Sequence, residues 1–210
     1  MNVLILTNGS YGDYHFCKKE ENFDYIICAD RGLCHARKLG LIPDLIVGDF
    51  DSTDSTDLQY FKEKGIEIET FNSQKDETDT ELAISRALQK GARKVTVWGG
   101  VGSRLDHSLG NVHLLYKLLK SGVEGKLVNP NNTVYLAKES IQLKGKKGDL
   151  VSLIPFGGNA KGVTTHQLAY ALENATLEIG TSLGISNYLL EEVAEVWIKE
   201  GMLLVIMACD

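Results

Sequence analysis

Six aspartates that follow predicted β-strands are the side chains of this chain best suited to chemistry. They are spread over four separate turns, at Asp30, Asp49, Asp51, Asp76, Asp79 and Asp106. Because ligands of an open α/β sheet bind at the carboxyl ends of its strands, we expect these carboxylates to line one crevice. Carboxylates brought that close repel one another unless a cation neutralises them. The pattern therefore predicts a divalent-metal site that handles a polyphosphate.

Asp49 and Asp51 belong to the pentapeptide GDFDS, which starts at Gly48. If the preceding strand continues through it, alternation places both carboxylates on one face. Two carboxylates on one side form a hard-oxygen site that suits Mg²⁺, and Gly48 would let a phosphate approach the backbone. The alternative is an Asp-rich turn that caps the next helix, because residues 52–55 are also good N-cap residues. The pentapeptide alone leaves both interpretations open.

Asp76 and Asp79 lie where another helix is expected to begin. Thr78 and Glu81 fit a capping box at this position. Compensation of a helix dipole is worth well under about 2 kcal/mol. Capping explains one acidic residue at a helix start more easily than the three present here, Asp76, Glu77 and Asp79. We therefore interpret this turn as part of the same site.

A glycine-rich segment, GGVGSRLDH at residues 99–107, precedes the next predicted helix. Its N–H groups and the helix N-terminus can cradle phosphate oxygens, and Arg104 can add a bidentate contact. The segment is neither a P-loop, because it lacks Gly-Lys-Ser/Thr, nor a clean GxGxxG fingerprint. Taken alone, His107 is more typical of a polar residue at a helix start than of a catalytic base. One shared site nevertheless explains four such turns better than four independent capping roles.

The first part of the chain alternates short apolar runs with helical stretches. Strands are predicted at residues 3–6, 25–28, 45–47, 66–70 and 95–98. Helices are predicted at residues 32–39, 56–64, 80–90 and 106–119. The last helix carries one apolar face, formed by Leu105, Leu109, Val112, Tyr116 and Leu119. Alternating β and α elements imply an α/β fold, a mainly parallel, Rossmann-like α/β sandwich with helices on both faces of the sheet.

The pattern changes after residue 128, where a turn cluster is followed by short β-rich runs. Strands are predicted at residues 133–137, 140–143, 150–154, 162–165, 175–177, 185–190, 192–198 and 202–206. Many short strands at close spacing suggest an all-β sandwich or a small barrel. We place the boundary near residues 122–132, which predicts an α/β domain at 1–125 and an all-β domain at 130–210.

Composition restricts the classes of partner. The chain has 210 residues and a formal net charge of −6, which argues against a nucleic-acid partner. No apolar run approaches the roughly 20 residues needed to span a bilayer, and residues 3–6 are too short for a signal peptide, so no membrane partner is expected. The cysteines Cys17, Cys28, Cys34 and Cys209 form no CxxC pair. We interpret them as reduced thiols of a cytoplasmic protein.

The ordered set of these motifs resembles the thiamine pyrophosphokinase family. The motifs are DRG from Asp30, GDFDS from Gly48, DETDTELA from Asp76, GGVGSRLDH from Gly99 and GTSLGISN from Gly180. Two further stretches match the family's binding domain, at residues 152–157 and 162–165. The resemblance covers nearly the whole chain, in order and at compatible spacing, and the five motifs together are highly specific.

This resemblance implies an N-terminal α/β catalytic domain, a C-terminal β-sandwich, and a homodimer with thiamine held between subunits. The implied reaction moves diphosphate from ATP to the thiamine hydroxyl and releases AMP. By motif position, Asp49, Asp51 and Asp79 are the catalytic and Mg²⁺-binding candidates. The wider ATP-binding set is Asp30, Arg31, Gly32, Asp76, Thr80, Gly99, Gly100, Arg104, Asp106 and His107. Ser186 and Asn187 match the region that binds the thiamine pyrimidine.

The residues also permit other functions. The aspartates and glycines alone would serve a magnesium-dependent phosphotransferase or phosphohydrolase acting on another small alcohol. A non-catalytic thiamine-binding module is a further alternative, although a binder of a cationic ring would not need six aspartates around a glycine-rich loop. The sequence departs from the family's pattern at residues 166–170, HQLAY, where a lysine is missing, and at Tyr188, where an acid often stands.

Overall fold

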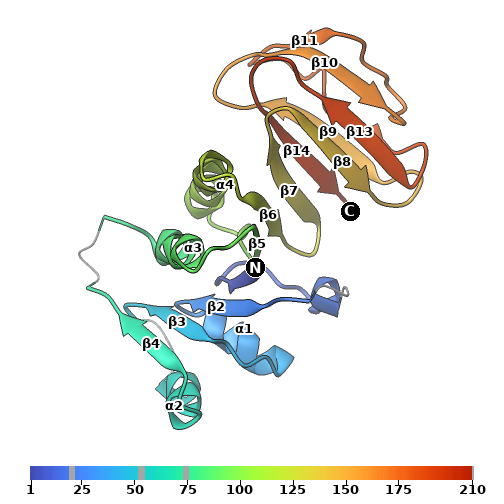
Figure 1. Cartoon of the computed structure of the whole chain (residues 1–210). Helices are drawn as coiled ribbons and strands as arrows, with labels where there is room; N and C mark the ends of the chain where they lie inside the picture. Colours follow the sequence, from blue (N-terminus) through green and yellow to red (C-terminus); the bar gives the residue numbers. More distant parts are fainter. Residues whose placement is uncertain (19–21, 52–54, 73–75, 210) are drawn as a thin grey trace. The chain divides into compact units, whose positions relative to one another are not determined.

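The computed structural model describes residues 1–18, 22–51, 55–72 and 76–209. The chain splits into two compact units, Met1–Pro130 and Asn131–Asp210, and each is described by itself. Figure 1 shows the helices gathered in the first unit, whereas the second is built from strands. None of the helices in the described part of the chain combines the length and apolar character needed to cross a bilayer.

The first unit contains a parallel sheet with the strand order β6-β5-β1-β2-β3-β4. Its strands are β1 (Asn2–Leu6), β2 (Tyr25–Ala29), β3 (Leu45–Gly48), β4 (Glu67–Thr70), β5 (Lys94–Trp98) and β6 (Glu124–Val128). The inner strands are near-continuous buried apolar runs, as expected where both faces of a sheet are covered. All five predicted strands are present, and β6 adds a sixth that the sequence patterns did not predict.

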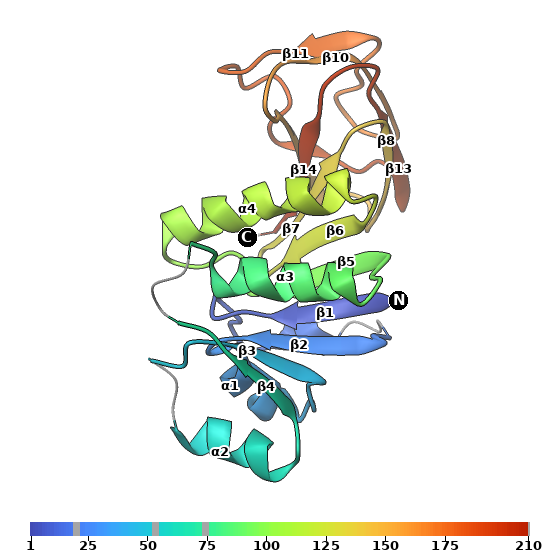
Figure 2. The same ribbon diagram turned by 60° about the vertical axis from the view of Figure 1, so that its left-hand side comes forward.

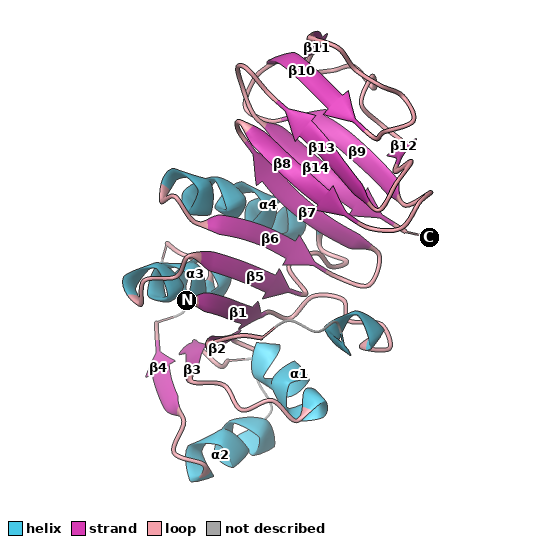
Figure 3. Cartoon of the chain, turned by 45° about the vertical axis from the view of Figure 1, so that its right-hand side comes forward, coloured by secondary structure: helices cyan, strands magenta, loops and turns pink. Residues whose placement is uncertain are grey.

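Helices cover both faces of this sheet. They are η1 (His15–Lys18, a 3-10 helix), α1 (Gly32–Leu39), α2 (Ser55–Glu63), α3 (Asp79–Gln89) and α4 (Leu105–Lys120). As Figures 2 and 3 show, α3 and α4 lie on one side, and α1 lies on the other. The predicted Rossmann-like α/β architecture is therefore confirmed.

Helix α4 buries a different face from the one that its apolar spacing suggests. Leu115 and Leu118 are buried, together with the polar Ser108. Leu105 and Leu109, by contrast, are 70% and 53% exposed. The apolar stripe predicted from spacing thus points largely away from the core, and a polar residue occupies a buried position near the start of the helix.

The connections create a topological switch point between β1 and β5. The chain passes from β1 through β2 and β3 to β4 in one direction, and then returns to place β5 on the other side of β1. In such sheets, ligands bind outside the carboxyl ends of the strands at the point where the order reverses. The loops that follow Leu6 and Trp98 therefore occupy the favoured position for a ligand.

The second unit is a β-sandwich. One sheet has the order β12-β9-β14-β7, and the other has the order β11-β10-β13-β8. The strands are β7 (Asn132–Ala137), β8 (Ser140–Lys144), β9 (Leu150–Pro155), β10 (Ala160–His166), β11 (Ala175–Leu177), β12 (Asn187–Tyr188), β13 (Val193–Trp197) and β14 (Leu203–Ala208). Buried side chains from both sheets, such as Val205 and Val196, form one core, which confirms the all-β sandwich.

One predicted strand of the sandwich is much shorter than expected. The run at residues 185–190 contributes only Asn187 and Tyr188 to β12. Ser186 has a φ of 59°, in the left-handed region, which an extended strand cannot accommodate. The prediction failed there because apolar composition does not report a single residue with a positive φ.

Candidate functional site

Two of the predicted acidic turns lie against each other at the carboxyl ends of β2 and β3. The Asp30 N–H donates to the Val47 carbonyl oxygen at 2.8 Å. A Cβ placed on Gly48 would lie 3.1 Å from the Cα of Asp30, so the two backbones are in contact. The parallel sheet therefore brings Asp30 and Asp49 to the same edge, as the motif positions predicted.

The predicted strand alternation across Asp49 and Asp51 is wrong. Strand β3 ends at Gly48, and Phe50 has a φ of 60°, so this segment is a turn. The Asp51 N–H donates to Asp49 Oδ1 at 3.2 Å, which closes the turn through the Asp49 side chain. For a bulky residue such as Phe50, the left-handed conformation is strained, and strain of this kind clusters at functional sites.

The third acidic turn leads into helix α3. Thr78 Oγ1 accepts the Glu81 N–H at 3.2 Å, as a helix cap should. The Glu81 side chain does not complete a capping box, because it accepts a hydrogen bond from Lys117 Nζ at 2.9 Å. Thr78 alone therefore supplies the cap, and Asp76 and Asp79 are not needed for it. Asp79 and the adjacent Thr80 are half-buried, whereas Asp76 is exposed.

The donor set at this edge suits a magnesium ion that is shared with a phosphate. Within the described ranges, no three His, Cys, Asp or Glu side chains are close enough to hold a metal by themselves. Mg²⁺ commonly binds through one or two carboxylates, waters and substrate phosphate oxygens, so Asp49 and Asp51 would hold such an ion only together with a phosphate. The residues therefore fit a cation that arrives with a polyphosphate better than a permanent all-protein site.

The glycine-rich segment forms a close backbone contact with the loop that follows β1. A Cβ on Gly9 would lie 1.8 Å from the Gly99 carbonyl oxygen, and a Cβ on Gly102 would lie 3.2 Å from the Gly9 Cα. The Ser10 N–H donates to the Val101 carbonyl oxygen at 3.2 Å. Glycine is required at Gly9 because any side chain would separate the two loops.

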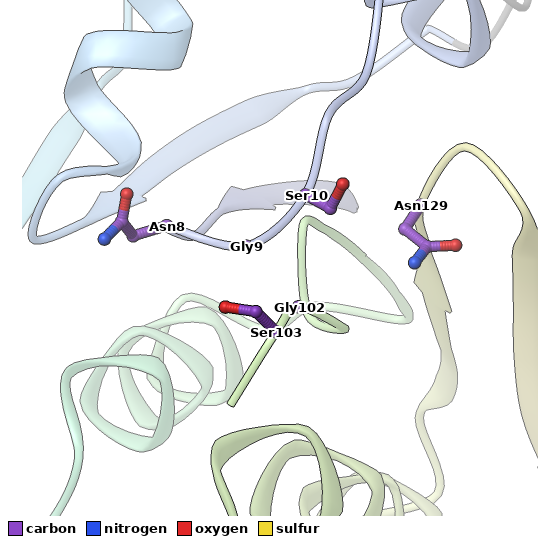
Figure 4. Close-up of a pocket in the computed structure, with 6 residues that line it drawn as sticks. All are labelled: Asn8, Gly9, Ser10, Gly102, Ser103 and Asn129. Atoms are coloured by element: carbon purple, nitrogen blue, oxygen red, sulfur yellow. The ribbon is translucent and has the colours of Figure 1, made fainter. Parts of the chain in front are cut away.

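An open depression of about 500 Å³ lies between these loops at the switch point. Figure 4 shows Asn8, Gly9 and Ser10 on one side and Gly102 and Ser103 opposite them, with Asn129 at one end. We call these six residues the switch-point pocket. Of them, the sequence patterns indicated only Gly102 and Ser103. An Asn-Gly pair directly after the first predicted strand was the signal that could have identified the others.

Arg104, which was predicted to contact phosphate, is paired with a neighbour in this structure. Its Nε and Nη2 atoms lie 3.2 Å and 2.5 Å from the two carboxylate oxygens of Asp106. This bidentate contact lowers the pKa of Asp106 to about 2. Both side chains are mostly exposed, so the pair is worth little in stability and can be exchanged for a phosphate. His107 follows on the first turn of α4 and is exposed.

A stack of aromatic rings contacts the start of the glycine-rich loop. The Tyr11 ring stacks on the His35 ring with a centroid separation of 3.7 Å, and Tyr14 Oη lies 2.8 Å from His35 Nδ1. Tyr11 Oη donates to the Trp98 carbonyl oxygen at 3.0 Å, and a Cβ on Gly99 would strike the Tyr11 ring. Burial, with Lys38 and Arg31 nearby, lowers the pKa of His35 to about 4. His35 is therefore neutral near pH 7.

The remaining predicted ATP-binding residues lie at the start of α1 and, for Gly100, in the glycine-rich loop. Arg31 is exposed and occupies the N-cap position without a capping hydrogen bond from its side chain. A Cβ on Gly32 would lie 2.0 Å from the Leu6 carbonyl oxygen, so Gly32 allows α1 to approach the end of β1. Gly100 is a buried residue of the glycine-rich loop, and a Cβ there would lie 3.2 Å from Leu127 and 3.3 Å from Val97. Gly32 and Gly100 thus support the backbone of the strand ends.

In the second unit, the predicted thiamine-binding pair plays two different parts. Asn187 is buried, and its Oδ1 accepts the N–H groups of Tyr170 and Tyr188, each at 2.9 Å. Its Nδ2 donates to the Tyr170 carbonyl oxygen at 2.8 Å. Asn187 therefore holds two tyrosines, whose rings pack edge to face with centroids 6.0 Å apart. Ser186 is exposed beside them.

Two family models match the chain, one after the other along the sequence. The model described as "Thiamin pyrophosphokinase, catalytic domain" matches residues 16–127. The model described as "Thiamin pyrophosphokinase, vitamin B1 binding domain" matches residues 138–203. The first model alone spans more than half of the chain, and it contains all the acidic turns described above.

Individual relatives agree with the two family models. A thiamine pyrophosphokinase of Bacillus subtilis (strain 168) is 29% identical over 187 residues, covering 88% of this chain and 87% of the relative. Thiamine pyrophosphokinase 1 of Oryza sativa subsp. japonica is 27% identical, covering 73% of this chain and 62% of that protein. The crystal structure of thiamine pyrophosphokinase from Bacillus subtilis gives a TM-score of 0.90 at 26% identity, with 100% of both chains covered.

These matches confirm the resemblance that the motifs predicted, across both units and in the same order along the chain. The chain belongs to the thiamine pyrophosphokinase family, a family of enzymes.

Proposed function

We propose that this protein catalyses the Mg²⁺-dependent transfer of diphosphate from ATP to the hydroxyl of thiamine, giving thiamine diphosphate and AMP. The observation that carries this proposal is the coincidence of two features in the first unit. The acidic turns lie within the segment that matches the family's catalytic domain. They also lie at the carboxyl ends of parallel strands, where substrates of such sheets bind.

In this proposal, Asp49 and Asp51 hold the ion together with phosphate oxygens of ATP, and Asp79 contributes from the start of α3. A bound Mg²⁺ would neutralise charge on the phosphates of the transferred group. Asp30 and Asp76 lie at the same set of strand ends and would add to the field that attracts the ion. The strained turn at Phe50 fixes the spacing between the two metal-binding carboxylates.

Transfer to the thiamine hydroxyl requires in-line positioning and charge neutralisation more than a strong base. A carboxylate within hydrogen-bond reach of the hydroxyl would accept its proton. Asp79 is our first candidate for this role and Asp51 our second. Because thiamine is cationic, the aspartates at these strand ends would also favour its approach.

The glycine-rich loop and the switch-point pocket are proposed to bind the phosphate end of ATP. Their lining is neutral and polar, and it includes the side chains of Asn8, Ser10 and Ser103 (Figure 4). Arg104 would exchange Asp106 for a phosphate oxygen, because an exposed ion pair offers little resistance to such an exchange. Thr80 and His107 stand at neighbouring helix starts and complete the predicted set.

The thiamine ring is proposed to bind at the Tyr170 and Tyr188 pair of the second unit. Tyr170 is 64% exposed, although its backbone is held by two hydrogen bonds to Asn187. An exposed aromatic face attracts a cationic ring. Asn187 would therefore act through the tyrosines, and Ser186 would supply a polar contact beside them.

Replacing Tyr170 tests the proposed thiamine site. Tyr170→Ala should raise the KM for thiamine by about fivefold, because a stacking or cation–π contact is worth about 1 kcal/mol, and leave the KM for ATP unchanged. Tyr170→Phe keeps the ring and is the matched control. An unchanged KM for thiamine in the alanine variant would place the ring elsewhere.

A cytoplasmic homodimer completes the proposal: the dimer rests on the family resemblance alone, and the cytoplasmic location on the interpretation of the four cysteines as reduced thiols. Sedimentation velocity of the purified protein would test the oligomeric state, since a dimer of this 23.1 kDa chain is readily distinguished from a monomer. A single monomeric species at assay concentration would contradict it.

Product analysis tests the reaction itself. The purified protein would be incubated with ATP, Mg²⁺ and thiamine, with an EDTA-treated sample as the control, and the nucleotides and thiamine esters would be separated. Equal amounts of AMP and thiamine diphosphate, absent with EDTA, are expected. ADP with thiamine monophosphate would indicate transfer of a single phosphate. Tight thiamine binding without turnover would indicate a non-catalytic binder.

A further inference from the structure

Helix α4 reaches back to the glycine-rich loop through a buried serine on its first turn. Ser108 Oγ accepts the Gly102 N–H at 3.1 Å. The same oxygen lies 3.0 Å from the Arg104 carbonyl oxygen and 3.2 Å from the Gly102 carbonyl oxygen, so its single proton also has an acceptor. Ser108 is 8% exposed. The serine therefore ties the middle of the loop to the helix that follows it.

An asparagine on the next turn of α4 makes a second tie. Asn111 Nδ2 donates to the Gly100 carbonyl oxygen at 2.8 Å. Together with the bond from the Ser10 N–H to the Val101 carbonyl oxygen, three consecutive loop residues, Gly100, Val101 and Gly102, are each held by a separate donor or acceptor.

Neither side chain is explained by the needs of the helix. Serine and asparagine are weaker helix formers than alanine or leucine, and the buried face of α4 is otherwise formed by Leu115 and Leu118. A polar group is retained in such a position only when its hydrogen bonds are satisfied. Here the side chains of Ser108 and Asn111 form hydrogen bonds with backbone atoms of the segment from Gly100 to Arg104.

The loop needs such support because its glycines give it many alternative conformations. Gly99 has a φ of 72°, and Gly100 and Gly102 lie on either side of Val101. A glycine loses more conformational freedom on ordering than any other residue. A loop that is ordered before its ligand arrives does not lose that freedom on binding, so the ligand binds more tightly.

We propose that Ser108 and Asn111 are positioning residues that hold the glycine-rich loop in its nucleotide-binding conformation before ATP binds. This inference rests on the proposed function, in which the loop contacts ATP. The two side chains act on the nucleotide only through the loop backbone. Their loss should therefore affect ATP more than thiamine.

Ser108→Ala and Asn111→Ala test this role when kinetics are combined with hydrogen exchange. In the absence of substrate, exchange of the amides at residues 99–104 should become about tenfold faster, since one hydrogen bond is worth about that factor. The KM for ATP should rise by a similar factor, while the KM for thiamine and kcat change by less than about twofold.

Two controls separate positioning from general destabilisation. Ser121→Ala removes a serine at the other end of α4, far from the loop. Its Oγ donates to the Lys117 carbonyl oxygen at 2.9 Å. Ile84→Val removes one methyl group from the buried core of α3 and lowers the melting temperature without touching the loop. Both controls should leave the KM for ATP and the exchange of residues 99–104 unchanged.

The possible results are distinct. Faster loop exchange with an unchanged KM for ATP would overturn the proposal. Equal changes in the KM for ATP and the KM for thiamine would also overturn it. So would a rise in the KM for ATP of Ile84→Val that matches the rise in the alanine variants. Unchanged loop exchange in both alanine variants would also overturn it. Failure of the proposed function would appear separately, as a wild-type protein that does not convert ATP.

Discussion

The acidic edge and the glycine-rich loop lie at the carboxyl ends of one parallel sheet, yet they are built in opposite ways. We use acidic edge for Asp30, Asp49, Asp51, Asp76 and Asp79. The loop, residues 99–104, is held by Ser108 and Asn111 of α4 and by the backbone of Ser10. At the acidic edge, the described residues contain no group of three ligands close enough for a metal.

This difference follows from charge. Neutral backbone groups can be ordered by the protein alone, because each N–H finds an acceptor within the fold. Carboxylates repel one another, so gathering several at one point without a cation is unfavourable. We infer that the loop is complete before the substrates bind, whereas the acidic edge is completed by the ion and the phosphates that it binds.

The largest expected effect is the loss of one carboxylate from the acidic edge. Asp79→Asn should reduce kcat by about a hundredfold to ten-thousandfold, the range expected when a catalytic proton acceptor is removed, and leave the fold intact. The measurement is initial rate with saturating ATP and thiamine, with circular dichroism as the check on folding. Asp57→Asn is the matched control, because Asp57 also lies on the first turn of a helix but pairs with Arg37. Near wild-type turnover in Asp79→Asn would remove the residue from the site.

A smaller effect is expected from the close backbone contact between Gly9 and Gly99. Gly9→Ala would force a Cβ against the Gly99 carbonyl oxygen, and we expect a loss of about 2 kcal/mol in the free energy of unfolding and a higher KM for ATP. Gly110→Ala in α4 meets nothing within 4 Å and should raise stability by about 1 kcal/mol without changing KM. Denaturant unfolding and ATP titration provide both values. If both variants behaved alike, the two loops would not depend on their contact.

The sequence predicted the architecture well because its signals are local. Short apolar runs identified β1 to β5, and the capping residue Thr78 marked the start of α3. The patterns did not identify residues whose position depends on how the chain turns. The hydrogen bonds from Ser108 and Asn111 to the loop that precedes them, and the place of Asn129 in the pocket, depend on the path of the chain rather than on residue spacing.

Within the site, the structure corrects the predicted geometry of one acidic turn and of one residue in the second unit. The acidic turns were found from residue type and position, but the positive φ of Phe50 left Asp49 and Asp51 in a turn rather than a strand. Asn187 was assigned to the substrate because it matches the family's motif for the region that binds the thiamine pyrimidine. In the structure, its side chain makes three hydrogen bonds to the backbone of Tyr170 and Tyr188. A single sequence does not distinguish a residue that touches a ligand from one that positions its neighbour.

The smallest expected effect concerns the ring stack beneath the loop. His35 has a folded-state pKa of about 4 against a usual value of 6.5, so between these values the unfolded chain binds the extra proton more readily. Stability should therefore fall as the pH is lowered from about 6.5 to about 4, and this contribution should not change further below pH 4. For this half-buried ring, we expect a loss on the order of 2 kcal/mol.

His35→Phe should remove this acid-dependent part while keeping the stack on Tyr11, since a phenyl ring packs in place of imidazole. The measurement is the free energy of unfolding of both proteins at pH 7, 5.5 and 4, and the relevant quantity is their difference, because the carboxylates titrate equally in both. The difference should move in favour of the phenylalanine variant as the pH falls. A constant difference would mean that His35 is not held neutral by its surroundings.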